Sequence, residues 1–346
     1  MALGFRRAGI EFDMAIDYDN DARSSYSLNM GHVPENINVK TTFPSLVRRL
    51  AKEKISLLVA DPPCVSWSYS GKKEGMTDPR DCLMETCALI ARLKPKAWLL
   101  ANVPGLDSKK NIRIVDDLIK PLPGYCSYAR LNAADFGVPQ IRRRPFWVGF
   151  QSERARAEFR WPTPSHAKEA WVTCRQALGH LPLEGLGRPI VLRWNGPDHR
   201  PSCADEPAKT LSTNPNSDGA VLVAERDRHK PNKADAPGAC VTTGARAGKG
   251  GNTLEWPWDR PSTTVQSDPR LGLPGHHDPE IPNSQHGPNA IVLSEKARLI
   301  LQGFPEDWIV CGKTKGSRDS QIGQAMPPAM AEAVAREIAR VMRWNR

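Results

Sequence analysis

Apolar and polar positions follow two different periods over residues 1 to about 150. Short apolar runs predict strands at 14–18 (MAIDY), 55–60 (ISLLVA), 97–103 (AWLLANV) and 145–150 (PFWVGF). Helical spacing of apolar residues predicts helices at 45–53 and 85–95. Strands that alternate with helices are typical of a parallel sheet covered by helices. The pattern therefore predicts an α/β domain.

The pattern changes after about residue 160. More than half of the 31 prolines fall between Pro162 and Pro288, among many Gly, Asn, Asp and Arg residues, which predicts a loop-rich region. Helical spacing returns at 293–304 and 329–344. We expect a catalytic and cofactor-binding domain over 1–160, completed by 291–346 through the terminal helix, and a separate domain over 161–290.

Composition narrows the choice of partner and compartment. A formal net charge of +10 favours a nucleic acid partner, although it is also compatible with a merely soluble protein. The 8 cysteines form no Cys-x-x-Cys pair and no zinc spacing, and no signal peptide precedes them, so we expect free thiols, a reducing cytoplasmic compartment and no metal. No apolar run approaches the length of a membrane span, so no membrane partner is expected.

The run ADPPC at 60–64 ends the second predicted strand. Pro62 and Pro63 stop that strand and leave Cys64 on the loop at its carboxyl end, where α/β sheets bind their ligands. A single cysteine is more often a small buried apolar residue than a nucleophile. Two prolines hold the next side chain in a defined direction, however, so Cys64 is a candidate nucleophile.

Four long segments, in order, resemble the DNA cytosine-5 methyltransferases. They are ADPPCVSWSYSGKKEGMTDPR (60–80), KPKAWLLANVPGL (94–106), GYCSYARLNAADFGVPQIRRRPFWVGF (124–150), and LSEKARLILQGFPEDW (293–308) with QIGQAMPPAMAEAVAREI (321–338). The resemblance spans nearly the whole chain except its variable centre. It implies a Rossmann-like, S-adenosylmethionine-dependent methyltransferase sheet domain with a smaller, loop-rich target-recognition domain.

The resemblance also assigns the chemistry. Cytosine C5 is a poor nucleophile, and addition of the Cys64 thiolate to C6 would activate it. Because the base is inaccessible inside a duplex, base flipping is implied. Arg144 should reach the cytosine O2, with Arg142 beside it and Gln140 completing the Gln-x-Arg-x-Arg signature. Without Gln140, the arginine run would be better explained as a solvated basic face or as phosphate contacts.

A related class also carries Asp-Pro-Pro, but follows it with Tyr or Trp and methylates exocyclic amines. The cysteine at position 64 favours carbon methylation instead.

The remaining site residues follow from the same resemblance. Asp17 ends the first predicted strand, where an acid binds ribose hydroxyls; an ordinary helix N-cap is the alternative. The expected catalytic set is Cys64, Ala101, Asn102, Gln140, Arg142 and Arg144. The expected cofactor set is Asp17, Tyr18, Asp61, Pro62, Gln324 and Met326. Contacts to double-stranded DNA are expected from Ser68, Lys72, Lys73, Arg246 and Lys249, in a monomer.

The chain departs from the family pattern in several places. It begins with MALGFRRAGIEF, which fits the residues directly after the family's Phe-x-Gly-x-Gly-Gly loop, so we expect the sheet to lack its first strand. Ala101 stands where the family has a Glu that assists protonation of the ring, a loss worth roughly 10²- to 10⁴-fold in rate. Gln324 stands where an Asn is usual.

Two hypotheses remain open at this point. The first is a working cytosine-5 methyltransferase. The second is a catalytically impaired relative that binds cytosine-containing DNA without methylating it.

Overall fold

The structure, a computed structural model, describes residues 1–63, 67, 78, 80–182, 187–189, 221–223 and 290–344. The chain divides into two compact units. The first comprises Met1–Phe136, Arg142–Ala167 and Met326–Arg346, and the second comprises Gly137–Ile141 and Lys168–Ala325.

The first unit contains the predicted sheet and its helices. In chain order its elements are α1 (Ala2–Arg7), β1 (Ile16–Asp17), α2 (Asn20–Met30), β2 (Glu35–Asn36), α3 (Val39–Leu50), β3 (Leu57–Ala60), α4 (Leu83–Leu93), β4 (Ala97–Ala101), α5 (Ile112–Ile114), η2 (Val115–Ile119), β5 (Tyr125–Asn132), η3 (Ala133–Phe136), β6 (Arg143–Phe150), α6 (Glu153–Glu158) and α11 (Pro328–Met342).

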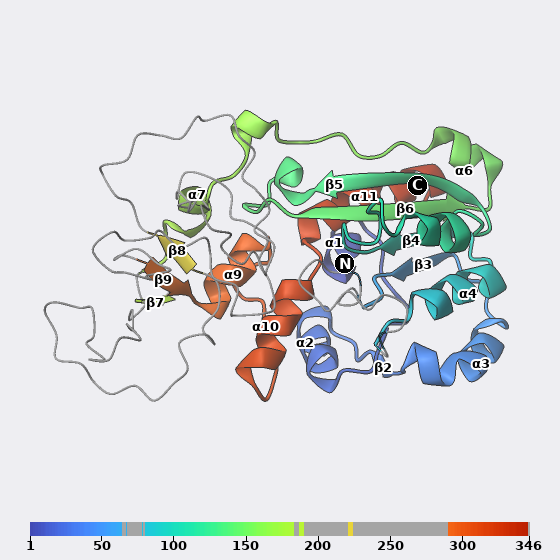
Figure 1. The fold of residues 1–346 in the computed structure, drawn as a ribbon, viewed down its shortest axis with the longest axis horizontal. Coiled ribbons are helices and arrows are strands. Elements are labelled where there is room, and N and C mark those ends of the chain that lie inside the picture. The colour runs from blue at the N-terminus through green and yellow to red at the C-terminus, as the bar shows by residue number, and fades with distance from the viewer. Residues whose placement is uncertain are drawn as a thin grey trace, which may run out of the picture. The chain divides into compact units, whose positions relative to one another are not determined.

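The main sheet has the strand order β3-β4-β6-β5 (Figure 1). β3 and β4 run parallel, whereas β6 is antiparallel to both β4 and β5. The predicted α/β class is confirmed, but the sheet is mixed and not parallel, because only the four residues of η3 and a short loop separate β5 from β6. β1 and β2 form a separate parallel pair, and within the described residues no ladder joins β1 to β3.

One face of the sheet packs on α4. Leu83, Cys87 and Ile90 recur at helical spacing along α4 and meet Trp98 and Trp147 of the sheet in one apolar cluster. Burial of each large apolar side chain stabilises the fold by about 1.5–3 kcal/mol. Lys94, whose φ of 46° is left-handed, caps the end of α4, and β4 begins three residues later.

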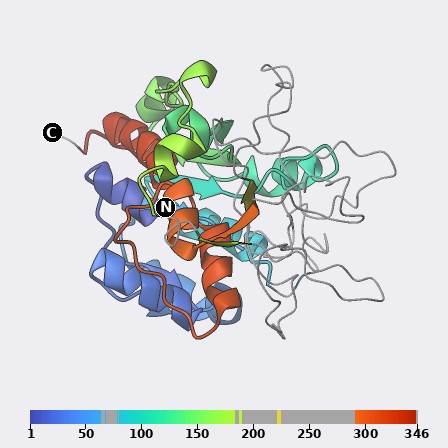
Figure 2. The same cartoon turned by 90° about the vertical axis from the view of Figure 1, so that its left-hand side faces the viewer.

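The other face lies on the side of α1 and α11 (Figure 2). Leu99, Phe146 and Val148 point to this face and are fully buried. α11 begins with Pro328 in its first turn, where a missing amide costs no hydrogen bond, and it packs against α1. Gly4 is the closest point of that contact, since a Cβ atom there would lie 2.4 Å from the Pro328 carbonyl oxygen.

The second unit is built around a short helix pair and a small sheet. Its elements are η4 (Lys168–Ala170), α7 (Cys174–Leu178), β7 (Gly187–Pro189), β8 (Val221–Val223), β9 (Ala290–Leu293), α9 (Glu295–Leu301) and α10 (Lys315–Gln324). The strands form an antiparallel sheet in the order β7-β9-β8.

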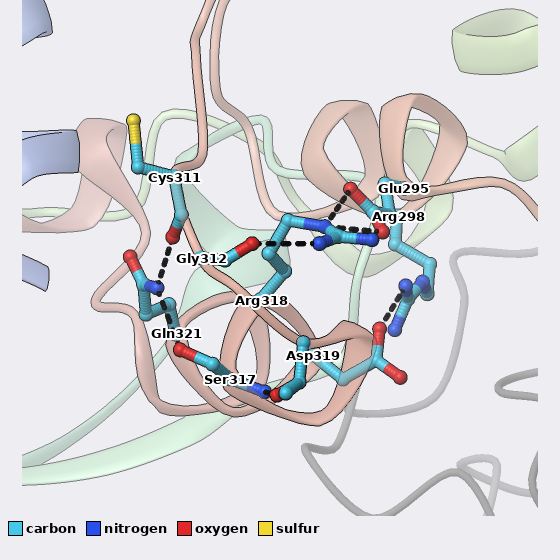
Figure 3. Close-up of polar contacts among 9 residues, drawn as sticks. Glu295, Arg298, Cys311, Gly312, Ser317, Arg318, Asp319 and Gln321 are labelled. Atoms are coloured by element: carbon cyan, nitrogen blue, oxygen red, sulfur yellow. Dashed lines mark hydrogen bonds and ion pairs between the residues drawn. The ribbon is translucent and has the colours of Figure 1, made fainter. Parts of the chain in front are cut away.

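Polar contacts hold α10 to α9 (Figure 3). Arg298 and Asp319 form an ion pair that is buried from solvent. Beside it, Arg318 Nε donates to Glu295 at 2.9 Å, and its Nη1 donates to the Gly312 carbonyl at 2.8 Å. Loss of one partner of a buried pair costs about 3–5 kcal/mol, so this pair commits α9 and α10 to one arrangement.

The strands and helices predicted from the periodicity are present, with shifted ends. The predicted helix over 45–53 is the second half of α3, which starts earlier because Asn38 caps it. The compact units divide the chain differently from the predicted domains, since 291–325 groups with the second unit and only the segment from Met326 groups with the first. Among the described helices, none has the length and apolar character that a membrane span requires.

The contact between α1 and α11 can be tested at Gly4. We expect Gly4→Ala to lower the free energy of unfolding by roughly 1–3 kcal/mol, because the new methyl group meets backbone atoms of α11 that cannot rotate away. Thermal unfolding followed by circular dichroism measures this. Gly316→Ala is the control: its methyl group would lie 3.9 Å from the nearest atom, so this variant should be neutral or slightly more stable. Equal melting temperatures for Gly4→Ala and the unaltered chain would contradict the expectation.

Candidate active site

The carboxyl ends of β3 and β4 bring two of the predicted site segments together. β3 is followed by Asp61 and Pro62, and β4 ends at Ala101 with Asn102 directly after it. Since the two strands are parallel and in register, both segments emerge at the same edge of the sheet.

Asn102 is buried at this edge and held by its neighbours. Its backbone amide donates to the Pro145 carbonyl at 3.2 Å, and its Oδ1 accepts from the Val103 amide at 2.8 Å. Its Nδ2 has no hydrogen-bond partner in the part of the chain that the structure describes. A buried donor without a partner costs about 1–3 kcal/mol, so this amide is available to a bound group.

Arg142 and Arg144 lie at the start of β6, and both are buried. Arg142 is held through its backbone, whose amide donates to Asn132 Oδ1 at 3.1 Å and whose carbonyl accepts from Ala133 at 2.9 Å. The Arg144 Nη1 donates to the Arg143 carbonyl at 3.1 Å. Burial of two guanidinium groups costs free energy. A partner that is negatively charged or carries a carbonyl group would offset part of that cost.

Asp61 shares this environment. Its side chain retains solvent-exposed surface, yet enough protein surrounds the carboxyl for desolvation to raise its pKa. Arg144 opposes that shift most strongly among the charges, followed by the N-terminal ammonium and Arg142. The structure thus brings Asp61, Arg142 and Arg144 into one electrostatic environment.

Gln140 is also fully buried, but its contacts lie within the second unit. Its Nε2 donates to the Leu301 carbonyl at 3.0 Å and to Gln302 Oε1 at 2.9 Å. Gln302 Nε2 in turn donates to the Ile322 carbonyl at 2.5 Å. These hydrogen bonds hold Gln140, two residues before Arg142, against the end of α9 and, through Gln302, against α10.

Several predicted residues lie outside the described part of the chain: Cys64, Ser68, Lys72, Lys73, Arg246 and Lys249. Residues that flank the first four are described. The indole of Trp67 donates to Asp81 Oδ1 at 2.8 Å, and Lys40 Nζ donates to the Asp81 carbonyl at 3.1 Å. The hydrogen bond from Trp67 to Asp81 therefore joins a residue that precedes Lys72 and Lys73 in the sequence to one that follows them.

Burial makes several described cysteines poor nucleophiles. It raises the pKa of Cys82 to about 11 and that of Cys87 to about 12, and it also raises the pKa of Cys126. A thiol must ionise to attack, so these side chains are almost entirely unreactive near neutral pH.

Two residues predicted to bind the cofactor follow β1. Asp17 ends β1, and its Oδ1 accepts from the Asp19 amide at 2.9 Å. Burial is the main cause of the raised pKa of Asp17. Asp19, and not Asp17, is the N-cap of α2, and its side chain accepts from the Ala22 amide. The ring of Tyr18 is 48% exposed and free to stack on a planar group.

The last two predicted cofactor residues fall in different units. Gln324 ends α10 in the second unit, and its Nε2 donates to Ser320 Oγ at 2.8 Å on the surface. Met326 belongs to the first unit and is buried ahead of α11. No group of three His, Cys, Asp or Glu side chains suited to a metal ion occurs among the described residues.

Sequence reasoning missed Gln302 and Asp81. Each accepts a buried hydrogen bond, Gln302 from Gln140 and Asp81 from Trp67, and a single sequence carries no signal for such pairs. Gln302 is followed by Gly303, whose φ is 80°. A glycine at this place commonly marks the end of a helix.

Comparison with known proteins identifies the family of this chain. The family description C-5 cytosine-specific DNA methylase matches residues 1–340, and the chain belongs to this family. The Type II methyltransferase M.NgoMIV of Neisseria gonorrhoeae is 29% identical over 347 residues, 99% of this chain and 94% of that protein. M.FnuDI of Fusobacterium nucleatum, also a Type II methyltransferase, is 36% identical over 174 residues, 48% of each chain.

The fold agrees with a solved structure. The Entamoeba histolytica methyltransferase EhMeth superposes with a TM-score of 0.58 at 12% identity, over 99% of this chain and 96% of the other. The predicted methyltransferase fold and the predicted family are therefore confirmed.

The amide chain at Gln140 gives a stability test. We expect Gln140→Glu to lower the free energy of unfolding by roughly 1–3 kcal/mol, because a carboxylate would face the acceptor oxygens of Leu301 and Gln302. Urea denaturation measures this. Gln324→Glu is the matched control, since its side chain is exposed and should change stability by less than about 0.5 kcal/mol. A similar small change for both variants would show that the buried amides do not stabilise the second unit.

Proposed function

We propose that this chain transfers a methyl group from S-adenosylmethionine to C5 of a flipped cytosine in double-stranded DNA, through a covalent adduct with Cys64. The observation that carries the proposal is the pair of buried guanidinium groups, Arg142 and Arg144, beside the carboxyl ends of β3 and β4. Family membership over residues 1–340 supports the reaction type.

The chemistry assigns a role to the loop after β3. The Cys64 thiolate forms a bond to C6 of cytosine, the π electrons of the C5–C6 bond form a C4–C5 double bond, and the π electrons of the C4–N3 bond move to N3, which takes up a proton. C5 is then nucleophilic and accepts the methyl group. N3 releases that proton when the C4–N3 double bond forms again after methyl transfer. Removal of the proton on C5 and cleavage of the C6–S bond restore the ring and the thiolate.

The arginines act on charge that develops in this reaction. Arg144 would donate to the cytosine O2 and stabilise negative charge in the ring, with Arg142 beside it. Because both are held in a buried position before substrate arrives, little reorganisation is needed at the moment of reaction. Asn102 contributes a buried donor, its Nδ2, at the same edge of the sheet.

The residues after β1 fit a nucleoside. A partly buried carboxyl at the end of a strand suits ribose hydroxyls, and an exposed ring next to it suits an adenine face. Asp17 would bind the ribose and Tyr18 would stack on the base, with Pro62 and Met326 near the methionine part. When bound, S-adenosylmethionine supplies an electrophilic methyl group.

The DNA partner follows from the substrate. We infer that the second unit recognises the target and that Ser68, Lys72, Lys73, Arg246 and Lys249 contact the duplex, with phosphate contacts that weaken as salt rises. The Type II relatives indicate a modification enzyme of a restriction system. We further infer a monomer that needs no metal.

Adduct formation separates an active enzyme from an impaired DNA-binding relative. With DNA that contains 5-fluorocytosine at the target, we expect mass spectrometry to detect a covalent complex at Cys64, because fluorine at C5 blocks the final elimination. Cys64→Ser should form no complex and should abolish methylation.

Cys126→Ser is the matched control. Burial keeps this thiol protonated, so the variant should form the adduct as the unaltered chain does. A chain that binds DNA and S-adenosylmethionine yet forms no adduct would favour the impaired relative.

A further inference from the structure

Asp61 lies level with the position where the family carries a catalytic acid. In the ladder between β3 and β4, Ala60 pairs with Leu100. The next residues along the two parallel strands are Asp61 and Ala101, so a carboxyl stands directly beside the residue that lacks one.

The sheet also places Asp61 on the same face as Arg144. Leu100 and Trp147 pair across β4 and β6 and point into the apolar cluster under α4. Side chains alternate along a strand, so the next residues on β3 and β4, Asp61 and Ala101, point to the opposite face. Ala101 pairs with Phe146, and Arg144, two residues from Phe146, shares its face.

The residue that stands between these two groups in the sheet, Ala101, has a side chain of a single methyl group. β4 separates β3 from β6, and neighbouring strands lie about 4.8 Å apart, so roughly 10 Å of backbone separates Asp61 from Arg144. An arginine side chain can reach across a methyl group over most of that span. Consistent with this, Arg144 is the charge that acts most strongly on the Asp61 carboxyl.

We propose that Asp61 is a catalytic residue of this chain, the acid that protonates N3 of the flipped cytosine in place of the carboxyl absent at position 101. The proposal rests on the function proposed above and deepens it. It differs from the expectation that Asp61 binds the cofactor.

Asp61 gives one proton to N3 and later takes it back. As the Cys64 thiolate bonds to C6, the C5–C6 π pair moves to C4–C5, the C4–N3 π pair moves to N3, and the Asp61 carboxyl gives its proton to N3. After C5 has accepted the methyl group, N3 returns that proton to the Asp61 carboxylate as the C4–N3 double bond forms again. The acid is thereby regenerated in each turnover.

The environment of Asp61 suits a proton donor. Desolvation raises its pKa, which increases the protonated fraction near neutral pH. Arg144, the N-terminal amino group and Arg142 lower the pKa, because they stabilise the carboxylate that remains after the proton is given to N3. A general acid is most effective when its pKa is near the working pH.

Single-turnover methylation of DNA by the full chain tests the proposal. We expect Asp61→Asn, which keeps the shape of the side chain and removes the proton, to slow methyl transfer by roughly 10²- to 10⁴-fold. The affinity for S-adenosylmethionine should stay within about twofold. Asp17→Asn is the control for a cofactor-binding role, and it should weaken that affinity instead.

The pH profile provides a readout that a merely structural role would not change. In the unaltered chain the rate should rise with pH as the Cys64 thiolate forms and should fall at high pH, because the protonated fraction of Asp61 decreases. Asp61→Asn should remove the falling limb.

Position 101 provides the reciprocal test. Ala101→Glu alone should change the rate little, because Asp61 already supplies the proton, whereas in the Asp61→Asn background it should restore most of the lost rate. If Ala101→Glu does not fold, the rate and pH profile of Asp61→Asn still decide the question.

The outcomes separate the two proposals. An unaltered chain that neither methylates DNA nor forms an adduct overturns the proposed function, and this assignment with it. An active chain in which Asp61→Asn keeps its rate, or loses only its affinity for S-adenosylmethionine, overturns the assignment of Asp61 alone. A rate gain of 10²-fold or more from Ala101→Glu in the unaltered background also overturns it, since the acid would then have been missing.

Discussion

The pairing of β4 with β3 on one side and β6 on the other is the constraint on which the rest of the site depends. Parallel pairing with β3 brings the ends of both strands to one edge, and antiparallel pairing with β6 returns the start of β6 to that same edge. Asp61 and Arg144, more than 80 residues apart in sequence, therefore lie in one electrostatic environment that no local sequence pattern specifies. Because β4 is buried on both faces, its register cannot slip without moving every apolar side chain out of place.

The sequence was sufficient for the class of fold and for the sheet-edge site, for identifiable physical reasons. ISLLVA and AWLLANV are mostly apolar because both strands lie in a sheet covered by helices, with β4 buried on both faces, and a proline pair ends the first run. It was not sufficient for the direction of β6, which is decided by the short connection through η3 and not by the residues of the strand. The short β2, with both residues exposed, carries no apolar pattern at all.

The compact units differ from the predicted domains because contacts between residues far apart in sequence cannot be read from periodicity. Gln140 belongs by sequence to the arginine signature, but its buried amide bonds to α9, more than 160 positions away. The ion pair of Arg298 with Asp319 and the bond from Gln302 to Ile322 join α9 to α10 in the same way. Long-range polar contacts of this kind join Gln140, α9 and α10, which fall in the same compact unit, whereas periodicity alone groups the two helices with the sheet. The position of Asp61 is a further example. Only the register between β3 and β4 shows that Ala101, which stands where the family has a Glu, has the carboxyl-bearing Asp61 as its neighbour.

The contact between α1 and α11 also bears on how the chain folds as it is made. Residues 2–7 pack against residues 328–342, and this contact forms only after nearly the entire chain has been synthesised. At about 5–20 residues per second, the ribosome needs tens of seconds to cover that interval, during which the apolar surface that α11 buries stays uncovered. Completion of the first unit is therefore a late event with high contact order, and a nascent chain released before α11 emerges should be a substrate for chaperones and proteases.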